Sequence, residues 1–201
     1  MNIKQALEDH LYRIDSCDWL EIGTDNGSEQ TALLSGICPT RLYSVDIDPQ
    51  RIDRNIYYYR DRNNIQFVCQ DGSEFLQQHQ GRFSLVFLDN FDWDSGNLKP
   101  FEDKRAHVQQ QIVRYTQLGM NMNNLQSQAV HLTQCMAVLP LMTERSVIII
   151  DDTYLTHDGV YAGKGGACVP YLLTQGWQYK DYEMGVAFWK PWQHTGGSRT
   201  K

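Results

Sequence analysis

The stretch WLEIGTDNGSEQTALL, residues 19–34, decides the fold. Its first four residues, Trp19 to Ile22, suit a buried strand, and they run directly into Gly23. Acidic and small residues follow, and then a segment that predicts a helix. Because glycine has no side chain, a loop of this kind is typical of a place where a ligand approaches the backbone closely. The first question is therefore which ligand this loop binds.

Four further apolar runs, rich in β-branched and aromatic residues, follow along the chain: RLYSVDI (41–47), IQFVCQD (65–71), FSLVFLD (83–89) and SVIIIDD (146–152). Helix-like segments lie between most of them, and this alternation predicts a parallel sheet with helices on both faces. Two more strand-like runs, WQYKDYE (177–183) and GVAFWKPW (185–192), predict an antiparallel hairpin at the sheet edge. We therefore expect a doubly wound α/β fold with a mostly parallel, seven-stranded sheet. Residues 1–192 are expected to form one domain with a lid-like insertion at 91–124, and 193–201 a disordered tail.

Composition excludes several functional classes. A chain of 201 residues with a formal net charge of -6 lacks the positive charge of a general nucleic-acid binder. No run of about 18 apolar residues predicts a membrane span, and the polar N-terminal segment does not resemble a signal peptide. Five widely separated cysteines without a Cys-x-x-Cys pair predict reduced thiols. We expect a cytoplasmic protein with no nucleic-acid or membrane partner, whose oligomeric state the sequence leaves open.

Acidic residues end all five predicted parallel strands. Doubly wound sheets bind ligands in the crevice beyond the carboxyl ends of their strands, so these residues are candidates for a site. The strand ends carry Glu21 and Gly23, Asp46 and Asp48, Asp71 and Gly72, Asp89 and Asn90, and Asp151 and Asp152. A single aspartate at a strand end is usually a turn residue, but five acidic ends in succession favour a binding site.

The first loop does not fit a phosphate. A dinucleotide-binding loop has the pattern Gly-x-Gly-x-x-Gly, whereas here Gly23 is followed by Asp25 and Ser28 at the other two glycine positions. No Gly-Lys-Ser/Thr sequence completes a P-loop either. Glu21 and Asp25 would repel a pyrophosphate and would favour a ligand with an ammonium or a sulfonium group.

The next two strand ends suit a nucleoside. Asp46 lies about twenty residues beyond the loop, where a carboxylate can accept hydrogen bonds from both hydroxyls of a ribose. Asp71 can accept a hydrogen bond from an adenine amino group. Together the three sites fit an adenosine joined to a small zwitterion.

These motifs resemble those of the class I S-adenosylmethionine-dependent methyltransferases. The resemblance rests on LEIGTDNG, YSVDIDP, CQDGSEF and FSLVFLDN, and it covers about residues 18–189. It implies S-adenosylmethionine as the cofactor, bound by Glu21, Gly23, Thr24, Asp25, Gly27, Asp46, Ile47, Asp71, Gly72 and Asp89. Asp25 stands where the family usually has its central glycine, which affects the contact with the methionine part.

Within that family, FLDN and IIIDDT are similar to the small-molecule O-methyltransferases of the catechol and macrolide-sugar type. This resemblance implies a divalent ion held by Asp89, Asp151 and Asp152. Oxygen donors of this kind suit Mg²⁺. The alternative is that Asp151 and Asp152 cap the following loop while Asp89 contacts the substrate.

The acceptor site is less defined. Phe91, Trp93 and Phe101 in the insertion are candidates for the wall of an acceptor pocket, or else they pack a helical cap. Lys164, among three glycines, is a candidate for binding an anionic group of the acceptor, unless its loop is simply flexible and solvated. His157 is a candidate general base, although a solvated loop histidine is the commoner case. The predicted catalytic residues are thus Asp89, His157 and Lys164.

We therefore expect a methyltransferase that acts on an oxygen of a small polar acceptor, with Mg²⁺ as a candidate activator. An aminopropyl transferase-like enzyme, or a cofactor-binding protein of the same fold without turnover, remains as the alternative.

Overall fold

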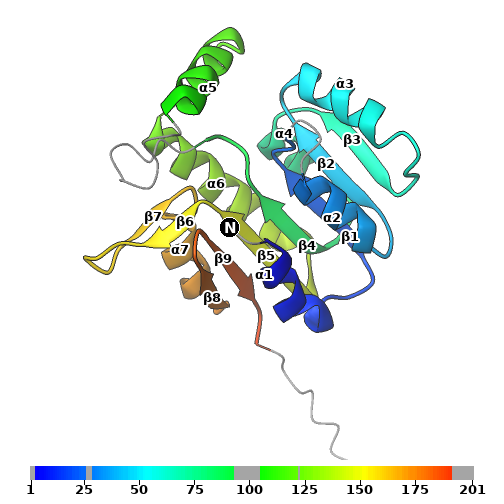
Figure 1. The fold of residues 1–201 in the computed structure, drawn as a ribbon. Coiled ribbons are helices and arrows are strands. Elements are labelled where there is room, and N and C mark those ends of the chain that lie inside the picture. The colour runs from blue at the N-terminus through cyan, green and yellow to red at the C-terminus, as the bar shows by residue number, and fades with distance from the viewer. Residues whose placement is uncertain (1–2, 26–28, 93–104, 122, 192–201) are drawn as a thin grey trace, which may run out of the picture.

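Seven strands form one twisted sheet (Figure 1). The computed structural model describes residues 3–25, 29–92, 105–121 and 123–191. The strands of this sheet are β1 (Asp18–Ile22), β2 (Leu42–Asp46), β3 (Ile65–Cys69), β4 (Phe83–Leu88), β5 (Met142–Asp151), β8 (Gln178–Tyr182) and β9 (Gly185–Trp189). Their order is β3-β2-β1-β4-β5-β9-β8. β1 to β5 are parallel, and β9 pairs antiparallel with both β5 and β8.

The predicted fold class is confirmed. Every residue of β4 is buried, as is the run Val147 to Ile150 in β5, because the centre of a doubly wound sheet is covered on both faces. The strand order changes sides between β1 and β4: β2 and β3 lie on one side of β1, whereas β4 and β5 lie on the other. Parallel strands all end at the same edge, so the acidic residues after β1 to β5 are brought together there.

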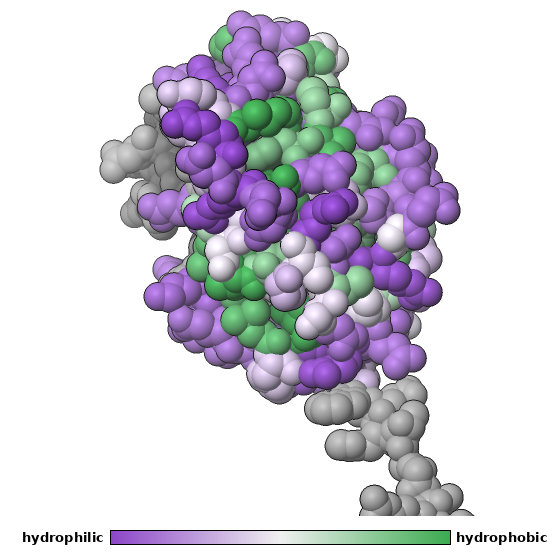
Figure 2. Space-filling view, turned by 90° about the vertical axis from the view of Figure 1, so that its right-hand side faces the viewer, coloured by the Kyte–Doolittle hydropathy of each residue, from purple (hydrophilic) through white to green (hydrophobic). Residues whose placement is uncertain are grey.

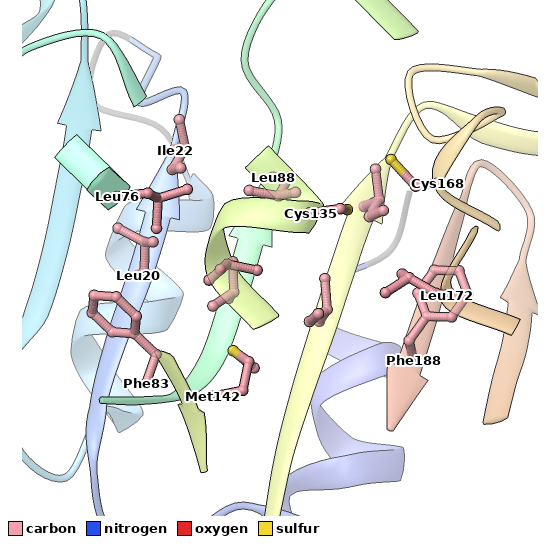
Figure 3. Close-up of a cluster of buried hydrophobic side chains, with 14 of the residues drawn as sticks. Leu20, Ile22, Leu76, Phe83, Leu88, Cys135, Met142, Cys168, Leu172 and Phe188 are labelled. Atoms are coloured by element: carbon pink, nitrogen blue, oxygen red, sulfur yellow. The ribbon is translucent and has the colours of Figure 1, made fainter. Parts of the chain in front are cut away.

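Helices cover both faces of the sheet. They are α1 (Ile3–His10), α2 (Glu29–Ile37), α3 (Pro49–Tyr58), α4 (Gly72–Gln78), α5 (Arg105–Gln117), α6 (Asn124–Val138) and α7 (Cys168–Thr174). Short 3-10 helices at Leu11–Arg13 and Leu139–Leu141 follow α1 and α6. On one face, Leu76 of α4, Cys135 of α6 and Leu172 of α7 pack against the sheet (Figure 3). On the other face, Leu7 of α1 and Leu34 of α2 do so.

Strand residues alternate between these two cores. Leu20 and Ile22 belong to the first core, whereas Trp19 belongs to the second, because successive side chains of a strand point to opposite faces.

The outer surface is mixed: Figure 2 shows hydrophobic patches in the middle of one side, framed by hydrophilic residues. None of the helices in the described part of the chain is long and apolar enough to cross a membrane.

A small hairpin lies outside the main sheet. β6 (Thr153–Leu155) and β7 (Tyr161–Gly163) follow β5 directly and pair antiparallel with each other (Figure 1). The register places Thr153 opposite Gly163. Residue 164 is thereby returned to the carboxyl end of β5, beside the acidic residues.

Candidate functional site

The first loop begins at a glycine that no other residue could replace. Gly23 has a φ of +96°, and a Cβ atom on it would lie 2.4 Å from the backbone nitrogen of Asn90. The ends of β1 and β4 are therefore in close contact, and the Asp89 nitrogen donates a hydrogen bond to the Ile22 carbonyl at 2.9 Å. Gly23 is placed as expected at a close approach, here between two strand ends. Gly27 lies outside the described residues.

Glu21 is buried beneath this loop. Its carboxylate accepts hydrogen bonds from the hydroxyls of Thr31 in α2 at 2.9 Å and Ser44 in β2 at 2.6 Å. Burial raises the pKa of Glu21 to about 7, although the two hydroxyl groups oppose the rise. Glu21 does not line the cavity described below, so it shapes the loop from underneath.

Asn55 of α3 also holds the loop, and the sequence analysis missed it. Its side-chain amide donates to the Thr24 hydroxyl at 3.1 Å and to the Asp25 carbonyl at 2.8 Å. Thr24 is fully buried, whereas the Asp25 side chain is largely exposed and lies 4.0 Å from the Arg51 guanidinium. Asparagine in the middle of an amphipathic helix is usually read as a surface residue, so this contact has no sequence signal.

A cavity of about 150 Å³ lies beyond the strand ends. It is lined by Ile22, Val45, Asp46, Ile47, Asp48, Arg51, Asp71, Gly72, Asn90, Phe91, Arg114, Tyr115, Leu118, Met120, Gln126 and Val130. Four of the predicted cofactor residues, Asp46, Ile47, Asp71 and Gly72, are among them. The cavity thus joins the second and third strand ends to the segments that follow β4.

Asp46 is a buried acid of this cavity. One carboxylate oxygen accepts a hydrogen bond from the Asp48 nitrogen at 2.8 Å, and the other lies 3.5 Å from the guanidinium of Arg51. Burial raises the pKa of Asp46 to about 6, while Arg51 acts in the opposite direction. The carboxylate is therefore held rigidly, with one oxygen turned toward a cation that a ligand could replace.

Asp71 and Gly72 form the neighbouring wall. The Asp71 carboxylate caps α4 by accepting hydrogen bonds from the nitrogens of Ser73 at 2.8 Å and Glu74 at 3.1 Å. A Cβ atom on Gly72 would lie 2.5 Å from the Ile22 side chain. Glycine is thus needed for α4 to begin against the end of β1.

Helix α5 closes the cavity from the other side. Arg114 forms an ion pair with Asp48, and Arg51 donates a hydrogen bond to Gln111 at 3.2 Å. The Asp92 nitrogen donates to the hydroxyl of Tyr115 at 2.8 Å. The described end of the expected insertion therefore lies over the cavity and is tied to the loops after β2 and β4.

Phe91 is the one predicted pocket aromatic that the structure describes. It is buried, has a φ of +47°, and its ring lies 5.0 Å from that of Tyr115, centroid to centroid. It lines the cavity, and its role in an acceptor pocket stays a prediction. Trp93 and Phe101 lie outside the described residues.

Lys164 lies among the acids at the ends of β4 and β5. Its ammonium is 2.6 Å from a carboxylate oxygen of Asp89, 3.3 Å from the Asp89 carbonyl and 3.2 Å from a carboxylate oxygen of Asp152. Burial opposes the charge on Lys164, but Asp89 and Asp152 hold its pKa well above the usual value. The side chain is therefore a charged, buried group and not part of a solvated loop, which is the alternative that the sequence leaves open.

The structure does not support the predicted magnesium site at Asp89, Asp151 and Asp152. Within the described ranges, no group of three or more histidine, cysteine or acidic side chains is arranged to hold a metal ion. The ammonium of Lys164 lies between Asp89 and Asp152, where a cation was expected. Asp151 accepts a hydrogen bond from the Asp152 nitrogen at 2.8 Å. Lys164 is 12 residues beyond Asp152, and it lies between these acids because the β6–β7 hairpin returns the chain to the end of β5.

The structure does not bring His157 to the site. It lies in the turn of the β6–β7 hairpin with a fully exposed side chain, 3.8 Å from Asp158, and does not line the cavity. A general base must reach the reacting hydroxyl, so this placement does not support His157 in that role.

His131 of α6 is a buried histidine that no sequence motif singles out. Its Nδ1 lies 2.8 Å from the Ser127 carbonyl, so Nδ1 carries the proton. Burial lowers the pKa of His131 to about 3, and the ring is therefore neutral. Its Nε2 is buried and has no hydrogen-bond partner within the part of the chain that the structure describes. The 3.6-residue spacing of α6 could have placed it on the inner face with Ser127 and Cys135.

Comparison with known proteins identifies the fold. No family model and no curated protein sequence matches the chain. Among solved structures, a protein from Streptococcus mutans described as a methyltransferase, in complex with SAH, is 11% identical with a TM-score of 0.61, over 94% of this chain and 97% of that one.

Two further solved structures resemble the chain to a similar degree. The N-methyltransferase NodS from Bradyrhizobium japonicum WM9 is 17% identical with a TM-score of 0.58, over 94% of both chains. An rRNA methylase from Streptococcus thermophilus is 11% identical with a TM-score of 0.57, over 96% of this chain and 98% of that one. The chain therefore has the Rossmann-like fold of these methyltransferases.

Proposed function

We propose that the protein is an S-adenosylmethionine-dependent methyltransferase. The observation that carries this proposal is the cavity at the carboxyl ends of the parallel strands, which is lined by Asp46, Asp71 and Gly72. A protein of the same fold was solved in complex with SAH, the product of methyl transfer from this cofactor, and others are named as methylases of different substrates. The fold alone would not establish the activity, but the chemistry of the cavity agrees with it.

The cavity residues have complementary roles toward such a cofactor. The ribose hydroxyls would donate hydrogen bonds to Asp46 in exchange for its contact with Arg51. The adenine would lie against Ile47, Asp71 and Gly72. The methionine part would extend past Gly23 toward Asp25, whose exposed carboxylate suits an ammonium group.

Asp89 is then beside the transferable methyl group. The backbone of Asp89 is in close contact with Gly23, and its side chain is 24% exposed, so the carboxylate can contact an acceptor. A bound S-adenosylmethionine would supply the methyl group to the acceptor oxygen, and its sulfur would keep the electrons of the broken carbon–sulfur bond. Asp89 accepts the hydroxyl proton and passes it to water. Positioning of the acceptor in line with that bond would provide most of the catalysis.

The acceptor that we propose is a small polar molecule with a hydroxyl group. The net charge of -6 disfavours an RNA acceptor, since phosphate binding requires clustered positive charge. The arginines of the cavity, Arg51 and Arg114, are both paired with acids, which leaves little positive charge for a phosphate backbone. No step is assigned to a metal, because the donor set does not fit one.

The test is transfer of labelled methyl groups to a panel of acceptors. Phenols, catechols, sugars, amines and bulk rRNA would be incubated with the protein and radiolabelled S-adenosylmethionine, and a diamine with the decarboxylated cofactor. We expect label on the oxygen of a small acceptor, and its loss in Asp89→Asn. The exposed variant Asp53→Asn is the control. Label only on RNA or nitrogen would contradict the proposed acceptor class, and aminopropyl transfer would contradict the reaction.

A further inference from the structure

The acids at the ends of β4 and β5 surround a cation that belongs to the chain itself. The ammonium of Lys164 has three hydrogens, and three oxygens lie within hydrogen-bond distance: two from Asp89 and one from Asp152. The Lys164 side chain is only 2% exposed. A buried ammonium needs this full set of acceptors, because an unpaired charge in the interior is strongly unfavourable.

The backbone around Lys164 is shaped to place this group. The Lys164 nitrogen donates a hydrogen bond to the Asp152 carbonyl at 2.9 Å, and the Gly165 nitrogen donates to the Thr153 hydroxyl at 2.9 Å. A Cβ atom on Gly163 would lie 1.7 Å from the Asp152 carbonyl oxygen. Asp152 itself has a φ of +45°, which is strained for a residue other than glycine. Glycine at 163 and a left-handed Asp152 together allow the lysine to reach the acids.

A divalent ion and this ammonium would compete for the same oxygens. Mg²⁺ requires carboxylate oxygens at about 2.0–2.1 Å in octahedral geometry. Such an ion would have to displace the ammonium from Asp89 and Asp152, and the displaced lysine would be left buried without its partners. The two cations therefore exclude one another.

We propose that the ammonium of Lys164 is the resident cation of Asp89 and Asp152, and that it takes the place of a divalent metal ion. The wild-type protein then neither binds nor requires a metal at these acids. Lys164 acts as a positioning residue, which fixes the Asp89 carboxylate while leaving part of it accessible. Removing the ammonium would leave the carboxylates of Asp89 and Asp152 with affinity for a divalent ion.

The experiment measures Mn²⁺ binding to the full chain by electron paramagnetic resonance and calorimetry, without cofactor or acceptor. It therefore succeeds or fails independently of the proposed methyl transfer. The proteins compared are the wild type, Lys164→Ala, and Lys164→Ala combined with Asp152→Asn. Lys180→Ala is the matched control, because Lys180 also pairs with an aspartate, Asp9, but at an exposed position. Circular dichroism would check that each variant is folded.

We expect Lys164→Ala to bind one Mn²⁺ at least tenfold more tightly than the wild type or Lys180→Ala, and Asp152→Asn to reverse the gain. Equal Mn²⁺ binding by Lys164→Ala and Lys180→Ala would overturn the proposal. So would binding of one Mn²⁺ by the wild type that Asp89→Asn removes. If Lys164→Ala does not fold, Lys164→Gln is measured under the same criterion. If neither variant folds, the wild-type titration is decisive: one bound Mn²⁺ that Asp89→Asn removes overturns the proposal, and no bound Mn²⁺ agrees with it.

Discussion

Gly159 and Gly163 both adopt a positive φ, but their surroundings differ completely. A Cβ atom on Gly159 would meet nothing within 4 Å, whereas one on Gly163 would collide with the backbone of Asp152. The two glycines lie in the same hairpin, with φ values of +75° and +85°. Alanine variants of the two glycines therefore separate the free-energy cost of backbone strain from that of displacing Lys164.

We predict that Gly159→Ala lowers the free energy of unfolding by about 1 kcal/mol, the usual cost of a left-handed alanine. Gly163→Ala should cost at least about 3 kcal/mol, because the collision is with backbone and the buried Lys164 loses its partners. Urea unfolding followed by circular dichroism gives both values. Similar losses in the two variants would show that the Gly163 contact does not hold Lys164 in place.

Single residues differ in how far the sequence reveals them. Gly23 and Asp46 could be predicted because their roles depend on a local strand–loop sequence. The placement of Lys164 could not, since it depends on a hairpin that returns the chain to Asp89, 75 residues earlier. His157 shows the opposite error: it is near Asp151 in sequence, but it lies in the exposed turn of that hairpin.

At the scale of elements, α5 is tied to the rest of the molecule mainly by polar contacts. Arg114 pairs with Asp48, the residue that caps α3, and Gln111 accepts a hydrogen bond from Arg51. Tyr115 adds a hydrogen bond and a ring contact to the segment after β4. The helix that closes the cavity therefore depends on side chains that also line it.

We predict that Arg114→Ala loosens α5 without unfolding the sheet. Amide hydrogens of residues 109–117 should exchange about tenfold faster or more, since the Asp48 carboxylate loses its cation and the helix loses an anchor. Hydrogen exchange with mass spectrometry would detect the change, with exposed Arg54→Ala as the control. Unchanged exchange in α5, or an equal increase in β4 and β5, would show that the ion pair does not anchor the helix.

The elements that the sequence predicts well are the buried ones. β4 and β5 are continuous apolar runs, so both their presence and their type could be read directly. The sequence of α5, RAHVQQQIVRYTQ, is mostly polar and has no clear apolar stripe, so its bounds could not be predicted. β6 and β7 have three residues each, too few for an alternating pattern, and were read as a glycine-rich loop.

For the whole molecule, the fold carries a buried carboxylate beneath its ligand loop. Glu21 lies on the face of the sheet that α2 covers, where its pKa is raised from 4.5 to about 7 by burial. A raised pKa means that the folded state favours the protonated acid. The unfolded chain then loses its proton first as pH rises, so Glu21 reduces the free energy of unfolding between about pH 4.5 and pH 7.

We predict that the free energy of unfolding falls less in Glu21→Gln than in the wild type as pH rises from about 4.5 to 7. The difference should be on the order of 3 kcal/mol. The hydroxyls of Thr31 and Ser44 can rotate to bond the amide, so the variant should keep the fold. Urea unfolding at pH 5 and pH 8 measures the difference, with exposed Glu144→Gln as the control. Parallel pH profiles for Glu21→Gln and the wild type would contradict the assignment.

We propose that the cavity beyond the strand ends binds S-adenosylmethionine through Asp46. Isothermal titration calorimetry measures this binding. We predict one site per chain for SAH and for S-adenosylmethionine in the wild type and in Asp53→Asn. Asp46→Asn should weaken binding about 30-fold or more, because a buried, charge-assisted pair of hydroxyl contacts is lost. Absence of heat with both ligands, or equal affinities for Asp46→Asn and the wild type, would contradict the account.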